Sequence, residues 1–134
     1  MRTLKIILVL VFFLPSGFMY GQNKTPVDIV QGQLTSYNKQ DLESFLSWYS
    51  DNVEIFNFPA ELVYTGKEKM RERYAAAWKS NPGQRAEVKE RINVGNTVID
   101  KEHITGRANG IDANVIAIYS IENQKIRRVY FIRE

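Results

Sequence analysis

The sequence has 134 residues, 44% of them hydrophobic, with one histidine, no cysteine and a formal net charge of +3. This length and apolar content suit one domain with a packed core, and the absence of cysteine excludes disulfides and thiolate metal sites. A single histidine argues against a zinc site, and so small a net charge argues against a nucleic-acid partner.

The N-terminus predicts a signal peptide over residues 1–21. Arg2 and Lys5 flank the start of an uncharged apolar run, residues 6–14, which is shorter than the roughly 20 residues that a membrane-spanning helix needs. We expect cleavage after Gly21, which leaves one domain over residues 22–134 and an exported protein, periplasmic or secreted, with no further membrane association. An uncleaved N-terminal anchor is the alternative.

Two helices are predicted at the start of the mature chain. Thr25 as the cap, a proline at the first helical position and Asp28 three residues after the cap form a helix start. Apolar residues then recur at helical spacing as far as Tyr37. Asp41 caps a second helix, whose apolar face extends to Tyr49.

A strand and a third helix follow. Residues 53–58 alternate like a strand, which places Asn57 on the same face as two apolar residues. After a loop, Thr65 and Glu68 have the spacing of a capping box. We therefore expect a third helix from this box to the helix-ending residues 81–83.

The rest of the chain predicts two antiparallel hairpins. Gly95 and the asparagine after it form a two-residue turn signal between strands 85–94 and 97–105. A turn this tight gives two pairs on an inner, apolar face, Ile92 with Ile99 and Val88 with His103. On the outer face it pairs opposite charges, Arg91 with Asp100 and Lys89 with Glu102.

The second hairpin, strands 115–121 and 126–132, is apolar on both faces. We therefore expect helices to cover one side of the sheet and a second subunit to cover the other. Phe56 and Phe58, which point away from Asn57 on the strand 53–58, are assigned to this dimer interface.

This order of elements resembles the nuclear transport factor 2-like superfamily, in particular its SnoaL-like and ketosteroid-isomerase-like branch. The motifs that carry the resemblance span nearly all of the mature chain: residues 37–42, 49–53, 66–70, 98–106 and 125–132. The resemblance implies an α+β fold, a cone-shaped barrel of three N-terminal helices packed on a curved antiparallel sheet (cystatin-like). It also implies an apolar pocket inside the cone and, often, a dimer through the sheet.

The catalytic residues of ketosteroid isomerases are not retained here. In that branch a tyrosine on the first helix and a protonated aspartic acid on a late strand hold the enolate oxygen, and an aspartate at the end of the first strand moves the proton. The resemblance places these three groups at Gln33, near Ile116 or Ala117, and at Asn57. Because a carboxamide is not a base, this isomerisation mechanism is not expected.

Several polar residues are candidates for the pocket. Gln33 and Asn57 are expected to hydrogen-bond a ligand, or alternatively to satisfy backbone groups at the pocket edge. Histidine is the residue type whose unperturbed pKa lies near neutrality, so His103, the single histidine, is the best candidate for a general acid or base; a hydrogen-bonded histidine near the end of the sheet is the alternative. Asp100 and Glu102 are spaced like a catalytic carboxylate pair, but their predicted partners Arg91 and Lys89 favour solvated or interfacial ion pairs.

Aromatic residues complete the predicted pocket. Tyr37, Tyr64 and Trp78 are expected to line it, together with Tyr74, because their rings supply apolar area with a polar tip. Because Tyr74 and Trp78 lie four residues apart on the predicted third helix, the alternative is that both are core residues that contact no ligand.

The principal hypothesis is an exported, homodimeric SnoaL-like domain that binds a small apolar molecule in its cone, without a metal or an organic cofactor. The alternative is an isomerase, cyclase or hydrolase, steroid-isomerase-like or polyketide-cyclase-like, that uses His103 with Gln33 and Asn57. A protein-interaction module is a third hypothesis, which the well-charged helix surfaces disfavour.

Overall fold

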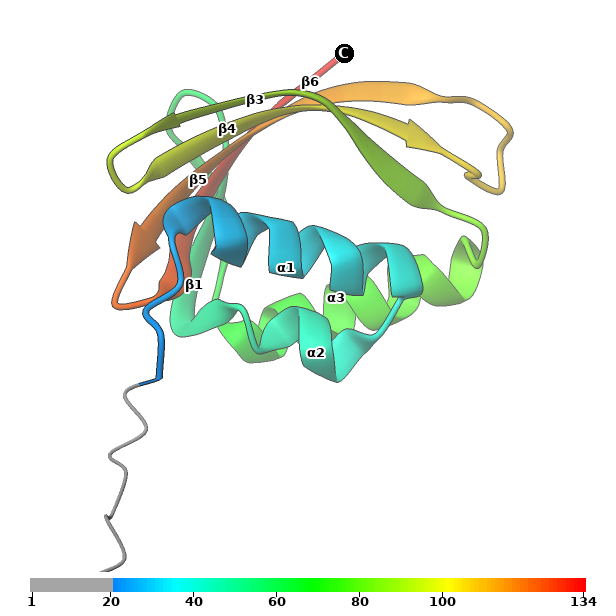
Figure 1. Cartoon of the computed structure of the whole chain (residues 1–134). Coiled ribbons are helices and arrows are strands. Elements are labelled where there is room, and N and C mark those ends of the chain that lie inside the picture. The colour runs from blue at the N-terminus through cyan, green and yellow to red at the C-terminus, as the bar shows by residue number, and fades with distance from the viewer. Residues whose placement is uncertain (1–20) are drawn as a thin grey trace, which may run out of the picture.

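The structure, a computed structural model, describes residues 21–134 (Figure 1), so the predicted signal peptide lies almost wholly outside the described residues. These residues form three helices and one six-stranded sheet in the order β2-β1-β6-β5-β4-β3. The helices are α1 (Pro26–Lys39), α2 (Leu42–Leu46) and α3 (Lys67–Ser80). The strands are β1 (Tyr49–Asn57), β2 (Glu61–Thr65), β3 (Arg85–Val94), β4 (Thr97–Thr105), β5 (Ala113–Glu122) and β6 (Lys125–Arg133).

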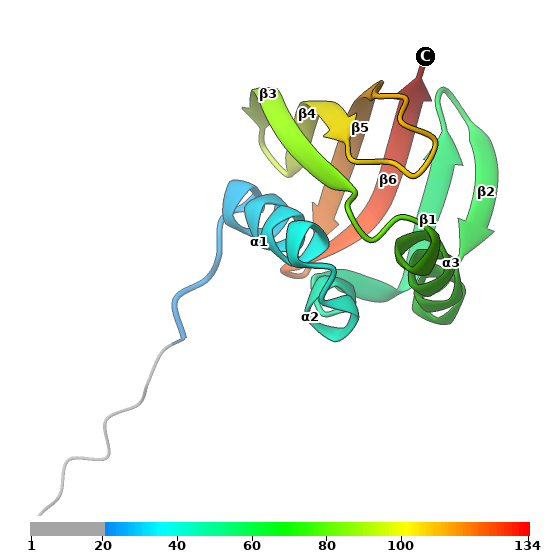
Figure 2. The same ribbon diagram turned by 90° about the vertical axis from the view of Figure 1, so that its right-hand side faces the viewer.

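The sheet is curved, and the helices pack on its concave side. Neighbouring strands are antiparallel except β1 and β6, which are parallel. Figure 2 shows the sheet curling from β3 to β2 around the space that α1 and α3 border. The predicted α+β cone is confirmed. Within the described residues, no helix is long and apolar enough to cross a membrane.

Helix α1 begins as the sequence predicts. The Thr25 hydroxyl accepts a hydrogen bond from the Asp28 backbone N–H at 3.1 Å, and the Asp28 carboxylate accepts one from the Thr25 N–H at 2.9 Å. A Cβ atom at Gly32 would lie 2.3 Å from the Trp48 ring, so only glycine allows this close approach of α1 to the turn before β1. The buried face of α1 carries Gln33 toward the sheet.

The region between α1 and α3 differs from the sequence prediction. Helix α2 ends at Leu46, and Tyr49 is already the first residue of β1. The predicted loop before α3 contains a short strand, β2, that pairs with β1. Thr65 belongs to this strand and therefore does not cap α3, whose N-cap is Gly66 with φ 97° and no side-chain cap. The predicted capping box is wrong.

The turn of the β3–β4 hairpin is as predicted, but the register further along is not. Beyond the pairs Ile92–Ile99 and Arg91–Asp100, a bulge between Val88 and Glu90 shifts the register by one residue. The sheet therefore pairs Val88 with Glu102 and Glu87 with His103. The predicted pairs Lys89–Glu102 and Val88–His103 are wrong.

The assignment of faces on β4 is also wrong. The inner face of β4 carries Val98, Asp100, Glu102 and Ile104, each at most 8% exposed. Ile92, expected inside, is 56% exposed on the outer face. Because side chains alternate along a strand, His103 lies on the outer face and Glu102 on the inner face.

The outer face of the sheet is apolar over several strands. Ile99, Ile118 and Tyr130 lie on adjacent strands in one row, and the Tyr130 ring stacks on Phe56 with ring centroids 4.7 Å apart. Phe58, just beyond β1, is 54% exposed. Helices of the described chain cover the other face of the sheet, so this row faces outward.

Candidate functional site

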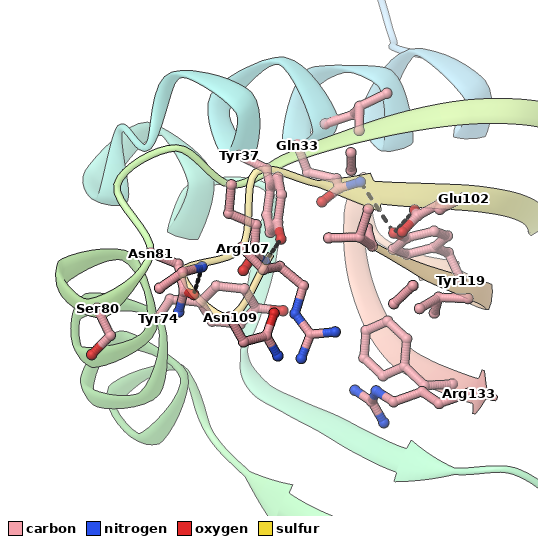
Figure 3. A pocket seen from close by; sticks show the side chains of 18 of the residues that line it. Gln33, Tyr37, Tyr74, Ser80, Asn81, Glu102, Arg107, Asn109, Tyr119 and Arg133 are labelled. Atoms are coloured by element: carbon pink, nitrogen blue, oxygen red, sulfur yellow. Dashed lines mark hydrogen bonds between the residues drawn. The ribbon is translucent and has the colours of Figure 1, made fainter. Parts of the chain in front are cut away.

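A cavity of about 480 Å³ lies between α1 and the concave face of the sheet (Figure 3). Its walls come from α1, from α3 and the residues that follow it, and from the inner faces of β1 and β3 to β6. The loop between β4 and β5 lies at its rim, where the Ala108 backbone N–H donates to Asn81 Oδ1 at 3.0 Å. Gly106, with φ 72°, passes so close to Gly83 that a Cβ atom would lie 2.0 Å from the Gly83 carbonyl oxygen. These contacts fix the loop against the segment that follows α3.

Glu102 projects into this cavity from β4 and is 7% exposed. Burial, and secondly the negative charge of Asp100, raise the pKa of Glu102 to about 7, although a hydrogen bond from Tyr119 and the charge of Arg91 act in the opposite direction. Such a carboxyl group accepts and releases protons near neutral pH, as a general acid or base must.

A chain of buried hydrogen bonds orients Glu102. The Tyr119 hydroxyl donates to Glu102 Oε1 at 3.1 Å and accepts from Gln33 Nε2 at 3.2 Å. Gln33 Oε1 in turn accepts from the Tyr49 hydroxyl at 3.1 Å. Burial raises the pKa of both Tyr49 and Tyr119 well above the usual value, so both phenols stay protonated donors. Among residues 21–134, nothing hydrogen-bonds Glu102 Oε2, which leaves this oxygen for a molecule in the cavity.

Asp100 lies on the same face of β4 but is fully paired. Its two carboxylate oxygens accept from Arg91 Nε at 2.7 Å and Nη2 at 2.9 Å, and Arg91 Nη1 donates to Gln31 on α1 at 3.0 Å. The predicted Arg91–Asp100 pair is therefore present, with Asp100 0% exposed rather than solvated. This pair ties the β3–β4 hairpin to α1.

Sequence reasoning missed Glu102 because it placed the wrong face of β4 inside. Both faces of β4 mix apolar with polar residues: Asp100 and Glu102 stand between Val98 and Ile104 on one face, and Ile99 stands among polar residues on the other. Alternation along this strand therefore does not decide which face is buried.

His103 does not face the cavity, so the prediction that it points inward is wrong. On the outer face, His103 Nδ1 lies 3.0 Å from Asn114 Oδ1, and Nε2 lies 3.4 Å from Asp112 Oδ2. The structure therefore does not bring His103 together with Gln33 and Asn57, as the enzyme hypothesis based on His103 requires.

Of the predicted pocket residues, Gln33 and Tyr37 line the cavity. The Tyr37 hydroxyl accepts a hydrogen bond from Gln84 Nε2, and burial raises the pKa of Tyr37. The hydroxyl proton of Tyr37 is therefore retained and is free to be donated into the cavity. Asn57 is on the inner face of β1 but does not line the cavity, and its Oδ1 accepts from Arg133 Nη1 at 2.8 Å.

Tyr64 and Trp78 lie outside this cavity. Tyr64 lines a smaller cavity of about 390 Å³ beside α3, with the Arg73 guanidinium 4.7 Å from its ring centroid. Trp78 packs in an aromatic cluster, 5.6 Å from the Tyr37 ring, and is 6% exposed. Trp78 therefore belongs to the core. Tyr74, the fourth aromatic candidate, lines both cavities.

In the described part of the chain, no cluster of three or more histidine and carboxylate side chains is arranged to hold a metal ion.

Comparison with known proteins identifies the fold's relatives. The SnoaL-like domain family matches residues 30–129. A cystatin-fold protein of Novosphingobium aromaticivorans is 32% identical, with a TM-score of 0.76 over 82% of this chain and 99% of the other.

Two further solved structures support the fold alone. A SnoaL-like polyketide cyclase of Agrobacterium tumefaciens is 21% identical, with a TM-score of 0.70 over 83% of this chain and 92% of the other. An NTF2-like protein of Cytophaga hutchinsonii is 18% identical, with a TM-score of 0.71 over 85% of this chain and 94% of the other. No curated protein matches this sequence.

Proposed function

The chain belongs to the SnoaL-like domain family, and from that premise we propose that its cavity binds a small, largely apolar organic molecule and that Glu102 moves a proton on it. The reaction class is proton abstraction from a carbon next to a carbonyl group. One observation carries the proposal: a carboxyl group with a pKa of about 7 faces a cavity and has one oxygen unpaired within the described residues.

The size and lining of the cavity suit a small organic molecule. Its volume of about 480 Å³ falls within the roughly 300–1,000 Å³ that ligand pockets occupy. Leu34, Ile104, Val115 and Phe131 supply apolar walls, and the polar groups gather at a few positions.

The polar groups supply both halves of an enolisation. The Glu102 carboxylate takes the proton through Oε2, and the electron pair of the broken C–H bond moves onto the carbonyl oxygen. The Tyr37 hydroxyl donates a hydrogen bond to that oxygen, where negative charge develops. This division differs from the isomerase pattern, because the base is on β4 rather than at Asn57.

Hydrogen–deuterium exchange at a ketone tests the proposal without a known substrate. A cyclic aryl ketone such as tetralone is incubated with the protein in D₂O, and loss of its α-proton signal is followed by NMR. We expect the wild-type protein to accelerate exchange and Glu102→Gln to lose roughly a hundredfold or more of that acceleration. Glu90→Gln, an exposed carboxylate on β3, is the matched control and should retain it. Equal rates for wild type and Glu102→Gln would refute the role of Glu102.

The outer face of the sheet supports a second proposal, a homodimer. Ile99, Ile118 and Tyr130 form an apolar row across three adjacent strands, with Phe56 stacked against Tyr130, and a contiguous apolar patch on a surface marks a site of interaction. Light scattering of the mature protein at several concentrations tests this proposal, and a monomer throughout would refute it.

Export is proposed from residues 1–21. Expression of the full-length chain in a Gram-negative host, followed by intact-mass measurement of the exported protein, should give a chain that begins at Gln22. Full-length protein retained in the membrane fraction would instead identify an uncleaved anchor.

A further inference from the structure

Two arginines face the cavity in addition to the groups already described. Arg107 lies in the loop after β4, and Arg133 is the last residue of β6. Figure 3 shows both guanidinium groups projecting into the cavity, away from the cluster of Gln33, Tyr119 and Glu102. The cavity is therefore acidic at one end and basic at the other.

Neither arginine is neutralised by the protein. Among residues 21–134, no carboxylate lies within 4.0 Å of Arg107 or Arg133. Four other arginines each have such a partner: Arg71, Arg91, Arg127 and Arg128. Arginines that are not paired with a carboxylate and face an apolar-walled cavity retain the capacity to bind an anion.

Both guanidinium groups are held in place with donors to spare. Arg133 Nη1 donates to Asn57 Oδ1 at 2.8 Å, and its guanidinium lies 4.4 Å from the Phe131 ring centroid. Arg107 Nη1 donates to the Ile111 carbonyl oxygen at 3.4 Å. A guanidinium has five N–H donors, so each arginine keeps several for a ligand.

We propose that Arg107 and Arg133 bind a carboxylate of the cavity's ligand, which makes that ligand an organic acid with an apolar body. The planar fork of N–H groups in a guanidinium matches the two oxygens of a carboxylate. At the other end the cavity presents the Glu102 carboxyl group rather than a cation, so the carboxylate of a ligand finds its oppositely charged partners at the two arginines. The placement of the reacting carbon at Glu102 rests on the proposed function above.

A matched pair of compounds tests the carboxylate site. Naphthylacetate and naphthylethanol share an apolar ring system and differ in the charged group, and calorimetry measures the affinity of each. We expect the wild-type protein to bind the acid about tenfold more tightly than the alcohol. Arg107→Gln and Arg133→Gln should each remove most of that difference by weakening the acid alone. Arg85→Gln, an exposed arginine that does not line the cavity, is the charge-matched control.

The outcomes separate this inference from the proposed function. Equal affinity of the wild-type protein for acid and alcohol would overturn the carboxylate site and leave the apolar cavity intact. If neither compound binds, the cavity of the proposed function fails together with its carboxylate site. An equal loss of acid affinity in Arg85→Gln would show that net charge, not these two arginines, causes the preference.

Asn57 acts as a positioning residue, because its side chain holds the guanidinium of Arg133. Asn57→Ala removes the acceptor that holds the Arg133 guanidinium, so it should weaken binding of naphthylacetate about threefold and leave naphthylethanol unchanged. An equal loss for both compounds would indicate a general disturbance of the fold instead.

Discussion

Replacement of Glu102 by glutamine should stabilise the protein at neutral and alkaline pH. In the folded protein, burial and the charge of Asp100 raise the pKa of Glu102 from 4.5 to about 7. The folded protein therefore binds this proton more tightly than the unfolded chain does. The resulting stabilisation is complete below about pH 4.5 and is lost as the pH rises to about 7, because ionised Glu102 favours the unfolded state.

The difference between the pKa of Glu102 in the folded and in the unfolded protein sets the size of the change in the free energy of unfolding. A shift from 4.5 to about 7, at about 1.4 kcal/mol per pH unit, corresponds to about 3 kcal/mol. Glutamine has the same shape, does not titrate, and can still accept the hydrogen bond from Tyr119. The free energy of unfolding of Glu102→Gln minus that of the wild type should therefore rise by about 3 kcal/mol between about pH 4.5 and pH 8. A constant offset from altered packing does not affect this rise.

Urea unfolding at a series of pH values measures the difference. Trp78 lies in the core and reports unfolding by its fluorescence. Glu90→Gln removes the same formal charge at an exposed position and reports the effect of net charge alone. A difference between Glu102→Gln and wild type that stays constant over this pH range would refute the reasoning, because it would mean that Glu102 is not desolvated in the folded protein.

Three further predictions concern the sheet and α1. Asp100→Asn leaves the Arg91 guanidinium without its carboxylate, so urea titration should show a loss of about 3 kcal/mol; an unchanged midpoint would contradict a structural role for the pair. Gly32→Ala places a methyl group in the Trp48 ring and should cost about 1–3 kcal/mol in thermal unfolding; wild-type stability would contradict the close approach seen here. Ile118→Asp should convert the proposed dimer to a monomer in light scattering, and an unchanged dimer would place the interface elsewhere.

Local sequence signals gave the parts of the fold that depend on a few neighbouring residues. The capping box of Thr25 and Asp28 and the turn at Gly95 need only residues close in sequence, and both are present. The capping box predicted at Thr65 failed because pairing of β2 with β1, a contact between different segments, holds that residue in the sheet. A local pattern thus predicts an element only where no other segment competes for its backbone.

The face of β4 could not be assigned from the hairpin alone. Both faces carry apolar residues, since Ile99 lies outside while Val98 and Ile104 lie inside. Docking of α1 decides between the faces, and the bulge in β3 then displaces Lys89 from Glu102. Neither event has a local sequence signal, so the buried carboxyl group was predicted to be a surface residue.

Burial of Glu102 both destabilises the folded protein at high pH and makes the Glu102 carboxylate reactive. Urea unfolding and ketone exchange should therefore report the same pKa. Burial that disfavours the ionised carboxylate lowers the stability of the folded protein above about pH 7 and also gives the base a proton affinity suited to neutral pH. The stability difference between Glu102→Gln and wild type should level off at the pKa of Glu102 in the folded protein. The rate of tetralone exchange should be half-maximal near that same pH, because only the carboxylate abstracts a proton. A half-maximal rate that lies more than about one pH unit from the pH where the stability difference levels off would mean that the group moving the proton is not Glu102.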